Sequence, residues 1–301
     1  MNYLYSLYGL IFQLPFCCPI LPEAPKDANP DVQLNIGHVP LKLDDPIIIN
    51  DSGAVGYCWE ASLNQYLLIG GDYLGRFLVE NGNKITFEYY SESNPDKIIY
   101  HLLHSVLAAV LRQRGILTLH ANVAGNQSGA LAISGSSGSG KSTTLAALIE
   151  KGYQMISDDI TVLNLTSDGQ IHALCGLPQT QLCFDAVQQM GLDPTNYARS
   201  PVRQSKIILP ISNIFQMKSA PLKTIYLLER SSKREIEVIP LTGVEKFIAL
   251  QSCIYGPLLP EQHPHLFNMF STIINSIRMF RILRPEDKWS LDKVVAQILK
   301  N

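Results

Sequence analysis

The stretch "LAISGSSGSGKSTTLAALIEKGYQMISDDITVLNL", residues 131–165, combines a glycine-rich turn with a pair of aspartates further along the chain. Residues 135–142 within it, GSSGSGKS, fit the pattern G-x-x-x-x-G-K-S/T. The apolar run before this turn predicts a strand, and the run after it predicts a helix. That context separates a phosphate-binding loop from an incidental Gly/Ser turn with a lysine. We therefore predict that the chain binds a nucleoside triphosphate.

Each residue type in the predicted loop suits a phosphate ligand. The glycines let successive backbone N–H groups turn toward the phosphate, and the helix N-terminus adds partial positive charge. Lys141 supplies a mobile cation, and the Ser142 hydroxyl is a ligand for a Mg²⁺ between the β- and γ-phosphates. The predicted nucleotide-binding residues are Gly135, Ser136, Ser137, Gly138, Ser139, Gly140, Lys141, Ser142 and Thr143.

The adjacent carboxylates Asp158 and Asp159 lie within the apolar run of residues 154–165, which predicts one strand. This strand follows the loop helix directly, so a βαβ unit would bring it beside the loop. Two carboxylates there can divide the work: one holds Mg²⁺, and the other accepts a proton from an attacking hydroxyl. The alternative is a solvated strand end without chemistry.

Working outward from the loop, the pattern predicts an α/β fold. Residues 116–124 and 129–135 are predicted as adjacent strands joined by a turn, and residues 141–152 as the loop helix, closed by Gly152. Further predicted elements are strands at 224–231 and 235–242, a helix within 240–253, a helix running into a strand over 263–283, and an amphipathic helix at 290–300.

Two domains are predicted. Residues 1–97 contain short runs of β-branched and aromatic residues separated by Pro, Gly, Asn and Asp, which indicates a small, mainly β module. Residues 98–301 are predicted as the phosphate-loop domain, opened by the helical run of residues 96–115.

Composition limits the class of protein. Charged residues make up 17% and hydrophobic residues 46%, as in ordinary globular proteins, and the net charge of −2 argues against a general nucleic-acid binder. The six cysteines form no C-x-x-C pair, which favours reduced, buried thiols. The apolar start, residues 7–21, contains Pro15 and Pro19 and has no Lys or Arg before Lys26, unlike a signal peptide. We expect a cytoplasmic protein with no membrane and no nucleic-acid partner.

The residues around the loop resemble the kinase domain of the HPr kinase/phosphorylase family. In that family a histidine opens the strand before the loop, and a Lys-Gly or Arg-Gly pair precedes a strand with two aspartates. His120, Lys151-Gly152 and Asp158-Asp159 match these features. The resemblance is specific across residues 115–165 and continues loosely over residues 177–187 and 278–299.

The resemblance implies roles for particular side chains. Asp158 would be the general base toward a serine hydroxyl, Asp159 would support the metal together with Ser142, and His120 would lie beside the reacting phosphate. In "SPVRQSKIILP", Arg203 and Lys206 are the candidates for a cation that neutralises charge on the transferred phosphoryl group, with a solvated basic loop as the alternative. The predicted catalytic residues are therefore Asp158, His120 and Lys206.

The function implied is an ATP- and Mg²⁺-dependent kinase of a serine hydroxyl on a peptide or protein. The chain is most similar to stand-alone members of the family, which include kinases of lasso-peptide precursors. Residues 175–183, CGLPQTQLC, stand where HPr kinases carry a regulatory signature, so neither HPr as substrate nor the reverse reaction is implied. A small-metabolite kinase and a non-catalytic nucleotide-binding regulator remain alternatives. Full HPr kinases form hexamers, which leaves a homo-oligomer open.

Overall fold

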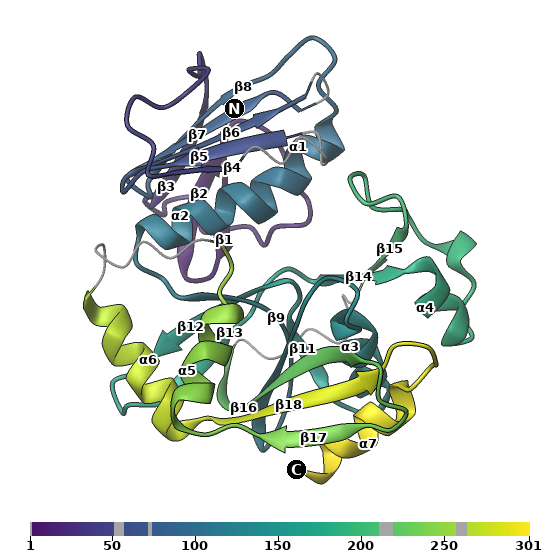
Figure 1. Cartoon of the computed structure of the whole chain (residues 1–301). Helices are drawn as coiled ribbons and strands as arrows, with labels where there is room; N and C mark the ends of the chain where they lie inside the picture. Colours follow the sequence, from purple (N-terminus) through teal and green to yellow (C-terminus); the bar gives the residue numbers. More distant parts are fainter. Residues whose placement is uncertain (1, 51–56, 72–73, 211–218, 257–263) are drawn as a thin grey trace. The chain divides into compact units, whose positions relative to one another are not determined.

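The computed structural model describes residues 2–50, 57–71, 74–210, 219–256 and 264–301. The chain is a mixed α/β protein that divides into two compact units (Figure 1). Unit 1 comprises Met1–Ile116 and Gly256–Pro264, and unit 2 comprises Leu117–Tyr255 and His265–Asn301. The main division therefore falls between Ile116 and Leu117, and not at residue 97 as the sequence pattern indicated.

The described part of unit 1 contains an eight-stranded sheet in the order β1-β2-β3-β8-β7-β6-β5-β4. Neighbouring strands are antiparallel except for the parallel pairs β2–β3 and β3–β8. The apolar start of the chain forms the hairpin of β1 and β2. The strands are β1 (Tyr3–Leu7), β2 (Leu10–Leu14), β3 (Val32–Ile36), β4 (Ile48–Asn50), β5 (Tyr57–Ala61), β6 (Gln65–Gly70), β7 (Arg76–Glu80) and β8 (Lys84–Glu88).

The helical run after this sheet belongs to unit 1. It consists of α1 (Pro95–His101), a π-helical turn η1 (Leu102–Val106) and α2 (Leu107–Gln113). Leu102, Leu103 and Leu107 face the apolar side chains of Leu7 and Ile85 across a small cavity. The Gln113 side chain accepts from the Gly82 N–H at 2.7 Å and donates to the Val79 carbonyl at 3.3 Å. Because its apolar face is buried on the sheet, this run closes the first unit instead of opening the second.

Unit 2 is built on a second sheet in the order β10-β9-β12-β13-β16-β18-β17. Strand β11 pairs with β9, and β10 also pairs with β16, so β10, β9, β12, β13 and β16 close into a ring. The strands are β9 (Thr118–Asn126), β10 (Gly129–Ser134), β11 (Gln154–Ser157), β12 (Ile160–Leu165), β13 (Ile171–Leu174), β16 (Ser219–Ser231), β17 (Glu237–Pro240) and β18 (Arg278–Pro285). A separate pair comprises β14 (Gln179–Cys183) and β15 (Lys206–Pro210).

The helices of unit 2 include those predicted from the sequence. They are α3 (Lys141–Glu150), α4 (Phe184–Gln189), the 3₁₀ turn η2 (Pro194–Asn196), α5 (Gly243–Ser252), α6 (Pro264–Ser276) and α7 (Leu291–Lys300). Gly152, with a φ of 89°, follows the end of α3. Within the described parts of the chain, no helix has both the length and the apolar character needed to cross a membrane.

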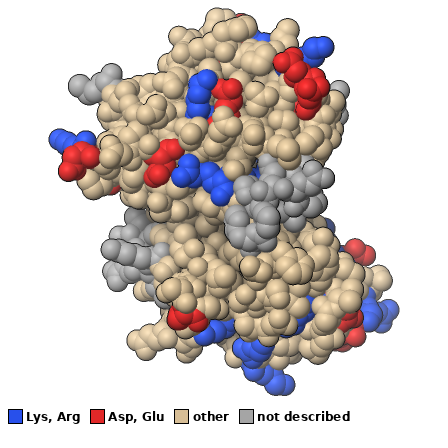
Figure 2. Space-filling model, turned by 90° about the vertical axis from the view of Figure 1, so that its left-hand side faces the viewer, with Lys and Arg blue, Asp and Glu red and all other residues tan. Residues whose placement is uncertain are grey.

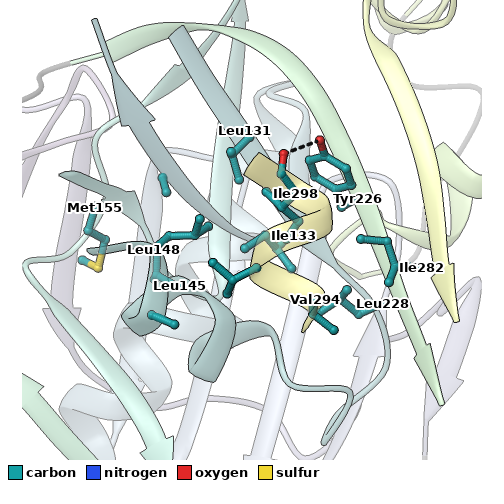
Figure 3. Packing of buried hydrophobic residues seen from close by; sticks show 13 residues of the cluster. Leu131, Ile133, Leu145, Leu148, Met155, Tyr226, Leu228, Ile282, Val294 and Ile298 are labelled. Carbon is teal, nitrogen blue, oxygen red and sulfur yellow. Dashed lines mark hydrogen bonds between the residues drawn. The ribbon is translucent and has the colours of Figure 1, made fainter. Parts of the chain in front are cut away.

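The core of unit 2 lies between the sheet and helices α3 and α7 (Figure 3). Leu145 and Leu148 of α3 and Val294 and Ile298 of α7 bury their side chains against the strands. The Tyr226 hydroxyl donates to the Ile298 carbonyl at 3.3 Å, which pairs the one polar atom of this buried ring. Burial of each such aliphatic side chain stabilises the fold by about 1.5–3 kcal/mol, so α7 is a structural part of the unit.

Strand direction brings several chain segments to one edge of the sheet. Strands β10 and β11 are both antiparallel to β9, so they run the same way as each other. Strand β10 is parallel to β16, and β16 is parallel to β18. The carboxyl ends of β10, β11, β16 and β18 therefore share one edge, which is where open α/β sheets bind their ligands.

Charge is dispersed on the described surface that Figure 2 presents. Lys, Arg, Asp and Glu side chains lie among uncharged ones there, and neither sign forms a continuous patch. A protein that follows a nucleic-acid backbone would need a basic stripe on its binding face. The described residues on this face do not form one.

Candidate functional site

The glycine-rich loop, residues 135–140, connects β10 to α3 at the shared edge of the sheet. At Gly135, φ is 143°, and a Cβ added there would lie 2.3 Å from the carbonyl oxygen of Leu228. Gly140, with a φ of 106°, is the N-cap of α3. A side chain at Gly135 would collide with β16, and the positive φ at both positions favours glycine. The pattern glycines are therefore required by local geometry.

Two arginines hold the carbonyls of this loop. The Arg230 guanidinium donates through Nη2 to the Gly138 carbonyl at 2.7 Å, and Arg284 donates through Nε to the Ser139 carbonyl at 2.6 Å. Arg230 and Arg284 are register partners on the parallel strands β16 and β18. Burial, and then the neighbouring Arg230 charge, lower the pKa of Arg284. We call this pair the arginine clamp; the sequence pattern did not identify it.

Lys141 is buried at the start of α3. Its Nζ donates to the Gly135 carbonyl at 2.7 Å and to the Ser136 carbonyl at 3.2 Å, so the side chain lies along its own loop. Burial lowers the pKa of Lys141, and the negative charge of Asp159 opposes that shift. The ammonium thus lies between the loop and the acidic pair.

Asn122 links the first turn of α3 to the acidic pair. Its Nδ2 donates to Ser142 Oγ at 3.1 Å, and its Oδ1 accepts from the Asp159 N–H at 3.3 Å. The side chain is fully buried on β9, two residues after His120. A buried amide within an apolar strand is an available sequence signal, because such a group needs hydrogen-bond partners. Asn122 was nevertheless not among the residues predicted from the sequence.

The acidic pair interrupts the strand that was predicted over residues 154–165. Strand β11 ends at Ser157, β12 begins at Ile160, and Asp159 has a φ of 68°. The Ile160 N–H donates to the Asp158 carbonyl at 2.8 Å across this sharp turn. Aspartate is one of the few residues other than glycine that adopt the left-handed region. The prediction of one continuous strand was therefore wrong, and the turn holds both carboxylates at the sheet edge.

Asp158 lies against the start of the loop helix. Its Oδ1 is 3.5 Å from Ser142 Oγ, and its Oδ2 accepts from the Gln181 N–H at 3.0 Å. Burial raises the pKa of Asp158 to about 6, with a further upward contribution from the charge of Asp159. This carboxyl group therefore exchanges a proton close to neutral pH, which is the range in which a general base is effective.

His120 faces the second aspartate. Its Nδ1 lies 3.4 Å from Asp159 Oδ1, and its ring centroid is 5.5 Å from that of Tyr255. Burial lowers the pKa of His120 to about 4 and outweighs the opposing effect of Asp159. The imidazole is therefore neutral at pH 7, and its contact with Asp159 is polar without being an ion pair.

Most of the predicted residues line one cleft of about 630 Å³ within unit 2. Those that line it are His120, Ser137, Gly138, Gly140, Lys141, Ser142, Thr143, Asp159, Arg203 and Lys206. Four predicted residues, Gly135, Ser136, Ser139 and Asp158, do not line it, and of these Asp158 contacts the cleft residue Ser142. The predicted catalytic, metal and nucleotide residues thus gather around one cleft.

The oxygen atoms at the acidic pair suit a hard cation. Among the described residues, no group of three or more His, Cys, Asp or Glu side chains is arranged to hold a metal ion. The hydroxyl of Ser142 and the carboxylate of Asp159 nevertheless both line the cleft. Mg²⁺ takes one or two such protein oxygens and completes its shell with water and substrate phosphates. The donor set fits that ion when a nucleotide supplies the rest.

Comparison with known proteins gives little beyond this geometry. No protein-family model matches the chain, and no curated protein matches its sequence. A structure similar to this one is that of the Hpr(Ser) kinase/phosphatase from Coxiella burnetii, with 15% sequence identity and a TM-score of 0.35. The match covers 61% of this chain and 88% of that chain. At this TM-score the likeness supports no statement about chemistry, which rests on the residues described above.

Proposed function

We propose that the chain is an ATP- and Mg²⁺-dependent kinase of the HPr-kinase-like type. It would transfer the γ-phosphoryl group of ATP to a serine hydroxyl on a peptide or protein. The observation that carries this proposal is the 3.5 Å approach of Asp158 to Ser142, the hydroxyl residue of the G-x-x-x-x-G-K-S loop. A carboxylate at that distance from a phosphate-binding loop can serve a reaction at the terminal phosphate.

The nucleotide half of the proposal rests on the loop. The N-terminus of α3 offers backbone N–H groups and partial positive charge to the phosphates. Lys141 adds a full charge, and the arginine clamp, which lines the same cleft, holds the loop carbonyls of Gly138 and Ser139. Ser142 and Asp159 would hold Mg²⁺, which when bound offsets the negative charge of the β- and γ-phosphates.

The transfer half rests on the acidic pair. Asp158 accepts the proton of the serine hydroxyl while the serine oxygen forms its bond to the γ-phosphorus. The bond between that phosphorus and the bridging oxygen breaks, and ADP leaves with the electron pair. Arg203 and Lys206 line the same cleft, where their positive charge opposes the negative charge of the transferred group. The neutral His120 can donate one hydrogen bond toward that group.

The acceptor rests on the sequence resemblance and not on the cleft. A serine side chain in a ribosomally made precursor peptide is the proposed source of the hydroxyl. The test uses a library of serine-containing peptides with radiolabelled ATP and Mg²⁺, beside the same library with each serine replaced by alanine. We expect label only on serine peptides; label on both libraries, or on neither, would contradict a serine acceptor on a peptide.

Nucleotide binding is tested separately with the Lys141→Ala variant. Backbone amides alone cannot neutralise the triphosphate, so calorimetry should record at least a tenfold loss of Mg·ATP affinity, the loss expected on removing an interaction of about 1.4 kcal/mol. Lys151→Ala is the matched control, because Lys151 is the exposed residue that caps the other end of α3. Equal ATP affinities in both variants would overturn the loop assignment and the kinase proposal with it.

A further inference from the structure

The cleft has a second wall that the proposed reaction does not use. Residues 286–291 follow β18 and lead into α7, and all six line the cleft. We call this segment the β18–α7 wall. It begins two residues after Arg284, whose guanidinium donates to the loop at Ser139. The wall therefore lies next to the phosphate-binding loop.

Strand order sets this wall apart from the acidic pair. Along the sheet edge, β11 lies on the β9 side of β10, while β16 and β18 lie on its other side. Asp158 follows β11, and the β18–α7 wall follows β18. A triphosphate held at the loop with its γ-phosphate toward Asp158 has its other end on the side of β10 where the β18–α7 wall lies. This orientation rests on the proposed function.

The charges of the β18–α7 wall favour the same orientation of the nucleoside. Glu286 and Asp287 give the β18–α7 wall two exposed carboxylates, and Lys288 lies 3.9 Å from the Glu235 carboxylate. Carboxylates repel phosphates but accept hydrogen bonds from ribose hydroxyls, as in dinucleotide-binding folds. Cations outside the wall also line the cleft: Lys141, Arg203, Lys206 and the two arginines of the clamp, whose guanidinium groups are bonded to loop carbonyls. The exposed carboxylates of the wall thus suit a neutral, hydroxyl-rich group better than a phosphate.

Two side chains of the wall suit a base and a sugar. Trp289 is 47% exposed, so its indole is accessible in the cleft for stacking. Ser290 is only 6% exposed, and its Oγ has no hydrogen-bond partner among the described residues. A buried hydroxyl in that condition needs a partner from water or from a ligand. Leu291 and Val294 supply apolar surface beside them.

We propose that the β18–α7 wall is the nucleoside subsite of the cleft. The indole of Trp289 stacks on the base, and the Ser290 hydroxyl bonds the base or the ribose. The chemical class of ligand is a nucleoside triphosphate whose base and sugar contribute affinity separately from its phosphates.

The experiment compares ATP with inorganic tripolyphosphate, which has the phosphates but no nucleoside. Calorimetry with Mg²⁺ measures both ligands against the full chain and its variants. Trp289→Ala should weaken ATP binding about tenfold, as expected for loss of one base stack, and leave tripolyphosphate affinity unchanged. Trp289→Phe should retain most of the ATP affinity, and Ser290→Ala should weaken ATP alone. Phe267→Ala, at an aromatic residue that is 75% exposed on α6, is the control for truncation outside the cleft.

Each other outcome overturns the inference. Unchanged ATP affinity in Trp289→Ala would mean that the nucleoside lies elsewhere. Equal losses for ATP and tripolyphosphate would mean that Trp289 acts on the loop or on the fold. If the wild-type chain binds neither ligand, the proposed function itself fails, and that result differs from a selective failure of the wall.

Discussion

The buried surroundings of Asp158 disfavour the ionised form of its carboxyl group. Burial raises its pKa to about 6, while the Gln181 N–H holds its orientation. Above that pH the group is ionised and can accept a proton; as the pH falls through 6 it becomes protonated and cannot. A base with these properties is matched to reactions near neutral pH.

The first prediction concerns Asp158→Asn. The amide cannot take the hydroxyl proton, so phosphoryl transfer should fall about 10²- to 10⁴-fold, while calorimetry should give ATP affinity close to that of the wild-type chain. The wild-type kcat/KM should decline as the pH is lowered below about 6. Asp168→Asn is the control, because Asp168 is an exposed carboxylate in a turn of the same unit. If the Asp158→Asn variant transfers phosphate at the wild-type rate, Asp158 is not the general base.

At the scale of residues, the sequence predicted those members of the site that lie within a short local pattern. Lys141 and Ser142 have fixed positions in the loop motif, and Asp158 belongs to an acidic pair that stands out within an apolar run. Asn122 has no such motif, because its importance comes from the two contacts that it bridges. Arg230 and Arg284 look like ordinary strand arginines until the register of β16 and β18 brings them to the loop.

Among the elements, the strand break at the acidic pair was the least predictable. Apolar runs flank Asp158 and Asp159, and no glycine or proline marks a turn there. What divides the strand is the turn itself: β11 and β12 pair with successive segments of β9, and the left-handed φ of 68° at Asp159 breaks the ladder between them. The turn is held by a contact from a distant part of the chain, the Asn122 amide on the Asp159 N–H, which leaves no local pattern, whereas the helices α3 and α7 follow from their own periodicity.

The second prediction tests the arginine clamp between β16, β18 and the loop. Arg284→Met removes the donors to Ser139 and Gly138 but keeps an unbranched side chain. Because each bond has a charged donor, ATP affinity should fall about tenfold or more. Amide exchange of the loop should also become faster in the absence of ligand.

Arg281→Met is the matched variant for this test. Arg281 lies on the same strand and bonds Glu229 at 2.9 Å, away from the loop. We expect it to retain both the ATP affinity and the slow exchange. If Arg284→Met changes neither measurement, the clamp does not position the loop.

For the whole molecule, the sequence predicted a β-rich first part and an α/β second part, and both are present. It did not predict the ring closed by β10 and β16, since such pairing joins segments far apart in the chain and leaves no local pattern. The sequence pattern put the boundary between the units at residue 97, before the observed division after Ile116, for a related reason. The amphipathic run of residues 96–115 predicts a helix, but not the sheet on which its apolar face is buried.

The third prediction follows from that burial. A fragment of residues 1–116 should unfold cooperatively in urea, whereas a fragment of residues 1–97 should not, because it lacks α2 and most of the buried helical face. In the longer fragment, Leu103→Ala should lower the free energy of unfolding by about 2–5 kcal/mol. Ile49→Ala, at a residue that is 63% exposed, should change it by less than about 0.5 kcal/mol. Cooperative unfolding of residues 1–97 would contradict the observed division.

The arginine clamp also has a consequence for the time at which the site is formed. Arg284 is 145 residues downstream of Ser139, the loop residue that it bonds. At about 5–20 residues per second, a ribosome needs on the order of ten seconds to add that interval. The glycine-rich loop therefore emerges well before Arg284, and it gains its full support only after β18 has been made. A nascent or truncated chain that stops before Arg284 has the motif without the clamp, so the proposed nucleotide site would be incomplete until that residue has emerged.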